Sequence, residues 1–181
     1  MLKNSVQHQS FESLLEKIEL PMYLTGSRYF GTNTSYSDWD LFIDEDSLRD
    51  VEHLSFEMDR VFSDWAFEYT STGGVAETGA NYTGKGVILV YKMRVDLNGT
   101  HVVHLQVVKN AEKRSALQEK FRDELNSISS ALKRISRCTL ATDVEDHYLV
   151  HSSLSQIERN VWSILVDPTL EDTTIDTIAD D

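Results

Sequence analysis

Residues 22–43 read MYLTGSRYFGTNTSYSDWDLFI, and this stretch decides which fold the chain can adopt. A short apolar run leads into Gly26 and Ser27, and after a polar stretch Asp38 and Asp40 enter a second apolar run. Side chains two apart on a strand point to the same face, so the two carboxylates lie side by side. Because like charges that close repel each other, the pair needs a compensating positive group.

A divalent hard cation is the usual partner of such a pair, because it takes oxygen ligands and keeps several waters. Mg²⁺ (or Mn²⁺) is therefore the expected cofactor, with Asp38 and Asp40 as its ligands and a phosphate-rich substrate supplying further oxygens. Gly26 lets the backbone approach a ligand closely. If a helix begins near Arg28, its first N–H groups and the Ser27 hydroxyl predict a phosphate-binding site, to which Arg28 could add charge.

The remaining pattern predicts a small mixed sheet covered by helices. Helical spacing of apolar residues marks a first helix over residues 11–18, ended by Pro21, and further helices over residues 48–61, 117–135 and 148–165. Strands are expected over residues 22–25, 37–43, 65–70, 87–95 and 101–108, and Asn98-Gly99 predicts a hairpin turn between the last two. This order is typical of an α+β or α/β fold.

The same pattern predicts how the chain is divided. Residues 1–110 form the expected core, and residues 111–166 form C-terminal helices packed on that core. Residues 167–181 form an acidic tail, which we expect to be disordered because it has charge and little to bury.

Composition limits the classes of function. The 181 residues carry a net charge of −13, which argues against broad, nonspecific binding to nucleic acid. Residues 109–137 nevertheless hold eight basic and four acidic residues, so an acidic protein could still present a partly basic surface. The longest apolar runs are too short to span a bilayer, and the N-terminus has no signal-peptide core. With one cysteine, Cys138, no internal disulfide is possible, and a cytoplasmic setting without membrane contact is expected.

The segment GSRYFGTNTSYSDWDLFI, residues 26–43, resembles the signature of the nucleotidyltransferase superfamily, which has the DNA polymerase β-like fold. That signature is a strand, Gly-Ser, a short helix, and Asp-x-Asp opening the next strand. The small stand-alone members, the minimal nucleotidyltransferases, are the nearest in size, and the resemblance covers roughly residues 11–110. It implies that these parts hold a divalent metal and the triphosphate of an NTP. It further implies transfer of a nucleoside monophosphate to an acceptor with release of pyrophosphate.

The family's third carboxylate, on a later strand, has no counterpart here. The expected position holds His104, between Val103 and Leu105. The nearest acid, Asp96, precedes the Asn98-Gly99 turn and should lie beyond reach of the metal. His104 could act as a general base, since an unperturbed imidazole titrates near pH 6.5, or it could be a half-buried residue bonded to a neighbour. As a ligand it suits Mn²⁺ or Zn²⁺ better than Mg²⁺.

Two functions of different classes therefore stay open. The first is a metal-dependent nucleotidyltransferase, catalysed by Asp38, Asp40 and His104, whose acceptor is a protein hydroxyl, a small molecule or an RNA 3′ end. The second is a catalytically degenerate relative that acts as an acidic binding module, a regulator or inhibitor of a basic partner protein. The residue that discriminates between them is His104.

Overall fold

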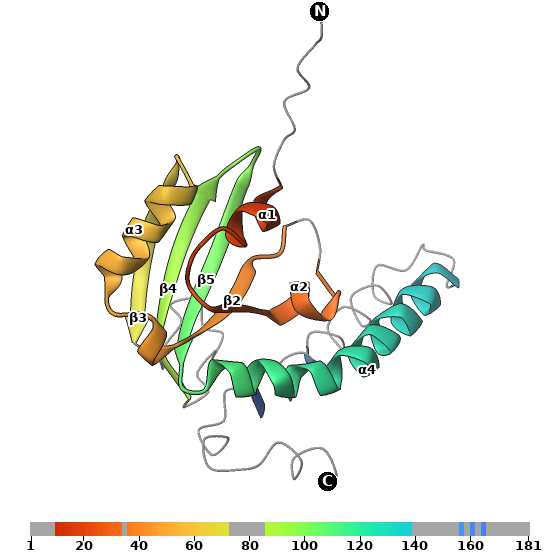
Figure 1. The fold of residues 1–181 in the computed structure, drawn as a ribbon. Coiled ribbons are helices and arrows are strands. Elements are labelled where there is room, and N and C mark those ends of the chain that lie inside the picture. Colours follow the sequence, from red (N-terminus) through yellow and green to blue (C-terminus); the bar gives the residue numbers. More distant parts are fainter. Residues whose placement is uncertain are drawn as a thin grey trace, which may run out of the picture.

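A five-stranded mixed sheet organises the computed structural model, which describes residues 10–33, 36–72, 86–138, 156–157, 160–161 and 164–165 (Figure 1). The strands are β1 (Met22–Thr25), β2 (Trp39–Asp44), β3 (Trp65–Thr72), β4 (Val87–Asp96) and β5 (Thr100–Val108). The helices are α1 (Phe11–Leu15), α2 (Gly26–Phe30), α3 (Val51–Val61) and α4 (Ala111–Cys138), with a 3₁₀ turn, η1 (Glu45–Ser47), before α3. The predicted α+β class, a small mixed sheet with flanking helices, is confirmed.

The strand order is β1-β2-β5-β4-β3, and the pairing of β2 with β5 is parallel whereas the other pairings are antiparallel. The predicted hairpin joins β4 to β5 through Asn98 and Gly99, whose φ angles of 53° and 129° are the positive values that such a turn requires. α3, β3 and β4 therefore form the crossover between two strands that are neighbours in the sheet.

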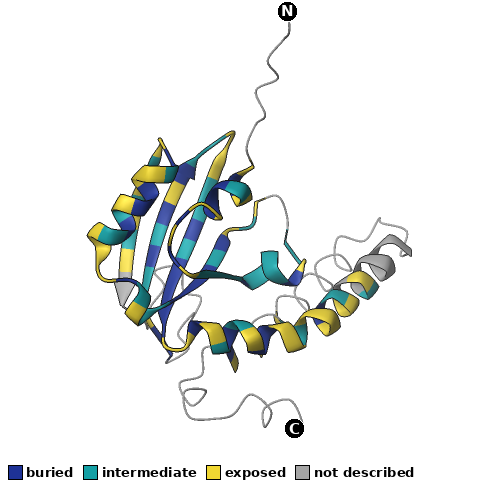
Figure 2. Ribbon diagram, viewed as in Figure 1, coloured by how far each residue is buried: buried dark blue, intermediate teal, exposed yellow. Residues whose placement is uncertain are grey.

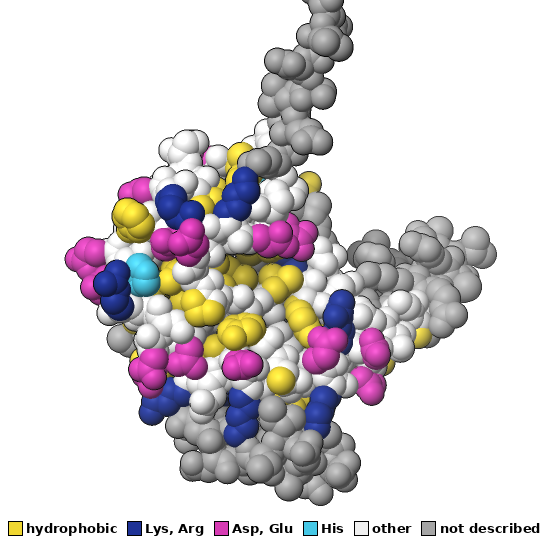
Figure 3. Space-filling model, viewed as in Figure 1, with side chains coloured by type: hydrophobic (Ala, Val, Ile, Leu, Met, Phe, Trp, Pro, Cys, Tyr) yellow, Lys and Arg dark blue, Asp and Glu magenta, His cyan; other side chains and the backbone are white. Residues whose placement is uncertain are grey.

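One face of the sheet packs against α1 and α3 (Figures 1 and 2). Trp39, Leu41 and Ile43 of β2 point into this core, as the alternation in the sequence predicts. In the space-filling view, hydrophobic side chains also reach the surface between α3 and α1, and acidic and basic side chains surround them (Figure 3).

The opposite face is covered at one end by α4. Phe42 and Val108 pack there against Leu117 and Leu125 of α4, and the Nε2 atom of Gln118 donates a hydrogen bond to the Leu24 carbonyl at 2.7 Å. Asp40 of β2 and His104 of β5 precede these residues on the same face, and both remain partly exposed. α4 thus limits the candidate site on one side.

The first helix is shorter than the sequence pattern predicts, because α1 ends at Leu15 although Pro21 is the first residue that forbids a helix. The following segment is held by α3 instead. The buried Glu57 carboxylate accepts hydrogen bonds from the Glu19 N–H at 2.9 Å and from Arg60 Nη2 at 2.7 Å, and Arg60 Nη2 also donates to the Lys17 carbonyl at 2.6 Å.

Several predictions concern residues outside the described ranges. The acidic tail over residues 167–181 lies outside them, as does most of the last predicted helix at residues 148–165. The predicted division into a core over residues 1–110 and packed helices over residues 111–166 stays a prediction. None of the helices among the described residues is long and apolar enough to cross a membrane.

Replacing Glu57 with Gln should lower the melting temperature at neutral pH by about 3–8 °C, the effect expected when hydrogen bonds to one charged group are weakened. The hydrogen bond from Arg60 and that from the Glu19 N–H hold the pKa of Glu57 below its ordinary value. A depressed folded-state pKa stabilises the protein above the unfolded pKa of about 4.3. The difference between the two proteins should therefore shrink as the pH falls below that value.

Thermal unfolding monitored by circular dichroism between pH 3 and pH 8 measures this difference. The exposed Glu16, which follows α1, provides the control Glu16→Gln, which should change the melting temperature little. A difference for Glu57→Gln that is the same at every pH would contradict the assigned role of the carboxylate charge.

Candidate active site

Asp38 and Asp40 lie on either side of Trp39, which is the first residue of β2, so the strand predicted over residues 37–43 begins two residues later than expected. Trp39 between them is buried in the core on the opposite face, which leaves both aspartates on the face partly covered by α4. In the parallel pairing of β2 with β5, Asp40 lies directly beside His104. The sheet register therefore brings together residues that are far apart in the sequence.

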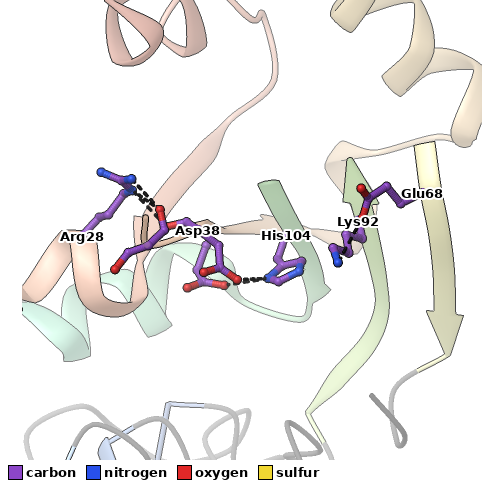
Figure 4. Close-up of polar contacts among 7 residues, drawn as sticks. Arg28, Asp38, Glu68, Lys92 and His104 are labelled. Atoms are coloured by element: carbon purple, nitrogen blue, oxygen red, sulfur yellow. Dashed lines mark hydrogen bonds and ion pairs between the residues drawn. The ribbon is translucent and has the colours of Figure 1, made fainter. Parts of the chain in front are cut away.

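The His104 ring contacts both carboxylates. Its Nδ1 atom is 3.3 Å from Asp38 Oδ2 and 3.4 Å from Asp40 Oδ1 (Figure 4). The side chains of Asp40 and His104 are 25% and 22% exposed, whereas that of Asp38 is 49% exposed, so the cluster is open to solvent from the Asp38 side. An imidazole N–H directed at two acceptors partly compensates their mutual repulsion.

The backbone of Gly26 packs against the Asp40 carboxylate from the side of β1, opposite His104 of β5. A Cβ atom at Gly26 would lie 2.4 Å from Asp40 Oδ2, and Gly26 has a φ of +66°, which L side chains rarely adopt. Its neighbour Thr25 pairs with Asp40 across β1 and β2. Glycine is therefore required here both by the close approach and by the backbone conformation.

Arg28 holds the backbone that leads into β2. Its Nε atom donates to the carbonyls of Ser37 and Asp38 at 3.1 and 3.0 Å, and its Nη2 atom donates to the Ser37 carbonyl at 2.5 Å. The guanidinium also lies 4.1 Å from the centre of the Trp39 ring. Burial lowers the pKa of Arg28, and the charge of Asp38 opposes that effect. These contacts position Asp38, while the predicted role of Arg28 in phosphate binding stays a prediction.

The other predicted phosphate-binding residue, Ser27, follows Gly26 in the first turn of α2 and is half-buried. α2 has only five residues, and Gly31, with a φ of +70°, ends it. The phosphate-binding role of Gly26 and Ser27 also stays a prediction.

Sequence reasoning did not single out Lys92 of β4, which is the cross-strand neighbour of His104 and forms a 3.0 Å ion pair with Glu68 of β3 (Figure 4). The available signal is a lone lysine at the centre of an apolar strand, between the buried Tyr91 and Met93. The other acid weighed from the sequence, Asp96, pairs with Thr100 at the far end of the hairpin, so it is remote from Asp40 as expected.

A divalent metal ion takes several oxygen ligands, of which Asp38 and Asp40 supply carboxylates. Among the residues that the structure describes, no group of three or more His, Cys, Asp or Glu side chains is placed to hold a metal ion. The aspartate pair nevertheless fits Mg²⁺, which proteins commonly bind through one or two carboxylates while water and substrate phosphates complete its coordination.

No protein-family model matches this chain, and no curated protein sequence matches it. Among solved structures, the chain is similar to one described as "Crystal structure of putative nucleotidyltransferase from H. pylori". The sequence identity is 12% and the TM-score is 0.34, over 94% of this chain and 98% of that chain. So low a TM-score carries no inference about the activity of this chain.

Replacing Gly26 with Ala should displace the Asp40 carboxylate, because the added Cβ atom would meet Oδ2. The ring resonances of His104, measured by NMR, should shift. Gly31→Ala is a matched control, since Gly31 has nearly the same φ but its added Cβ atom would meet Asn126 Oδ1 of α4. Both variants should be destabilised by about 1–2 kcal/mol, the cost of a left-handed residue, and only Gly26→Ala should alter the His104 signals. An equal change in both variants would contradict the proposed packing.

Proposed function

We propose that this chain is a nucleotidyltransferase that transfers a nucleoside monophosphate from an NTP to an acceptor hydroxyl with the help of a divalent metal. One observation carries the proposal. The carboxylates of Asp38, just before β2, and of Asp40, within it, converge on the His104 ring, and the backbone of Gly26, the first residue of α2, is packed against Asp40. A carboxylate pair next to a closely approaching glycine backbone suits a metal-bound triphosphate.

Each residue then has a defined task. Asp38 and Asp40 would hold Mg²⁺ or Mn²⁺, which when bound neutralises phosphate charge and orients the nucleotide. The backbone at Gly26 and the hydroxyl of Ser27 would bind the phosphates of the NTP. In the reaction the acceptor oxygen forms a bond to the α-phosphorus, the bond to the β-phosphate oxygen breaks, and pyrophosphate leaves.

His104 would accept the proton of the acceptor hydroxyl. Its Nδ1 atom faces Asp38 and Asp40, so a neutral ring that donates from Nδ1 carries its lone pair on Nε2. The contact with the carboxylates would also stabilise the ring once it is protonated. This is the geometry of a general base that is oriented by an acid.

The acceptor remains a protein hydroxyl, a small molecule or an RNA 3′ end. An RNA would be favoured by the basic residues of α4, which include the exposed Lys120 and Arg122.

A specific observation favours a second function. His104 lies beside Asp40, and its Nδ1 atom contacts both carboxylates, which partly compensates their repulsion. A catalytically degenerate protein would need this compensation, and with a net charge of −13 it could bind and regulate a basic partner protein.

Replacing Asp38 and Asp40 together with Asn should weaken Mg²⁺-dependent ATP binding at least about 100-fold, because even a residue behind a metal ligand is worth 10–100-fold. Without metal, the melting temperature should stay equal or rise slightly, since a repelling pair has been removed. Isothermal titration calorimetry with ATP and Mg²⁺ measures the binding. Asp96→Asn, at the far end of the hairpin, is the control and should bind ATP like the wild type. Unchanged binding by the double variant would refute the assigned ligands.

Substitutions at His104 separate the two functions, with pyrophosphate release from ATP as the measurement. If His104 is the general base, His104→Ala should lower the rate on the order of 10²–10⁴-fold. If the protein is a degenerate binder, the wild type should release no pyrophosphate, and His104→Asp should create or raise activity by adding a carboxylate beside Asp40. Robust wild-type release that His104→Ala leaves unchanged would show that this residue has no catalytic role.

A further inference from the structure

A row of polar side chains, Asp40 of β2, His104 of β5 and Lys92 of β4, runs across three neighbouring strands of the sheet. Lys92 of β4 pairs with His104 of β5, and Tyr69 of β3 pairs with Lys92. Tyr91 and Met93, the neighbours of Lys92, point into the core with α1 and α3, so Lys92 points to the face of the candidate site. Figure 4 shows Asp38, His104 and Lys92 along this face.

An irregularity in β3 holds the Lys92 side chain in place. The pairing of β3 with β4 shifts between Phe67 and Tyr69, so Glu68 is an extra residue in its strand. Two consecutive side chains therefore reach Lys92. Glu68 Oε2 is 3.0 Å from the Lys92 ammonium, and the centre of the Tyr69 ring is 5.3 Å from it. Bulges of this kind re-aim side chains and are common beside active sites.

The Lys92 ammonium also retains the capacity to bind another anion. It has three N–H donors, and the contact with Glu68 uses one of them. The hydrogen bond with Glu68 is the main cause that raises the pKa of Lys92, and the charge of Asp38 contributes to the same effect. Lys92 is therefore a positioned, charged group within electrostatic reach of the aspartate pair, and its side chain is 23% exposed.

The position of Lys92 in the row indicates which substrate it would contact. Gly26 lies on one side of Asp40, where the triphosphate is placed in the proposed function, and His104 lies on the other side. Lys92 lies beyond His104, two strands from Asp40, which at the usual strand spacing is on the order of 10 Å. An acceptor hydroxyl directed at His104 would bring the rest of the acceptor towards Lys92.

We propose that Lys92 binds a negatively charged group of the acceptor, and that the acceptor is an alcohol carrying a phosphate or a carboxylate a few bonds from its reacting hydroxyl. This inference rests on the proposed function for the identity of the other substrate. Lys92 is then a binding residue that selects the acceptor, whereas Glu68 and Tyr69 position it.

Two small anions, inorganic phosphate and acetate, serve as probes of this site in the ¹⁵N-labelled full chain. Each is titrated by NMR with Mg²⁺, in the absence and presence of a saturating non-hydrolysable ATP analogue, α,β-methylene-ATP. We expect phosphate to shift the amide signals of Lys92 and His104. Tighter binding of phosphate would indicate a phosphate-bearing acceptor, and tighter binding of acetate would indicate a carboxylate-bearing one.

Three variants test whether anion binding depends on the charge of Lys92 itself or on positive charge anywhere nearby. Lys92→Gln should weaken anion binding about tenfold, the value of one hydrogen bond to a charged group, while Lys92→Arg keeps the charge and should bind nearly as the wild type. Arg94→Gln is the matched control. Arg94 lies two residues along β4 and forms a 3.2 Å ion pair with Asp96, but it does not neighbour His104. Arg94→Gln should leave anion binding unchanged, and all three variants should bind the ATP analogue equally.

The possible failures are distinguishable. The inference is overturned if neither anion binds, if Lys92→Gln and Arg94→Gln weaken binding equally, or if Lys92→Gln weakens the ATP analogue instead of the anion. If the wild type does not bind the ATP analogue, the proposed function is overturned. In that event, phosphate binding that still depends on Lys92 supports the anion site, and phosphate binding that does not depend on it overturns the site as well.

Discussion

The repulsion between the carboxylates of Asp38 and Asp40 is the constraint on which the rest of the candidate site depends. Asp40 lies in β2 and Asp38 directly precedes the strand, and Trp39 between them is buried on the opposite face, so both carboxylates face His104. The His104 ring, which contacts both acids, compensates this repulsion, whereas the guanidinium of Arg28 binds the carbonyls of Ser37 and Asp38. One group compensates the carboxylates, and the other fixes the backbone that carries them.

The topology makes this compensation possible. Parallel strands need a long crossover, and here the crossover from β2 to β5 contains α3, β3 and β4. Because β4 returns antiparallel beside β5, the same hairpin that delivers His104 also delivers Lys92 to the adjacent position. The hydrophobic contacts of Phe42 and Val108 with α4 fix one end of this face. The polar row thus lies next to the part of this face that α4 covers.

Much of this arrangement could be predicted from the sequence, because it depends on local pattern. The shared face of Asp38 and Asp40 follows from their spacing, and the β4–β5 hairpin follows from Asn98-Gly99. The position of His104 came from the family resemblance, and the register places it beside Asp40. The predicted roles in binding a metal ion and phosphate cannot be tested by the sequence pattern or the strand register, so they stay predictions.

What the sequence could not predict depends on tertiary contacts. α1 ends at Leu15, and Glu57 and Arg60 of α3 bind the segment that follows it, a contact that nothing near Leu15 in the sequence signals. The bulge at Glu68 has no glycine or proline to mark it, so the ion pair with Lys92 is invisible before the strands are aligned.

Under the proposed function, the presence of His104 in place of a third carboxylate also sets the negative charge of the site. Three carboxylates would carry three negative charges, whereas Asp38 and Asp40 carry two and the imidazole of His104 adds no negative charge. The Lys92–Glu68 pair adds no net charge to this sum. Two negative charges match one divalent cation, and an ion that arrives with a triphosphate brings additional oxygen ligands of its own. If the chain has the proposed function, this charge suits one metal ion bound together with its nucleotide. His104 also leaves the side facing Lys92 less negative than a third acid would.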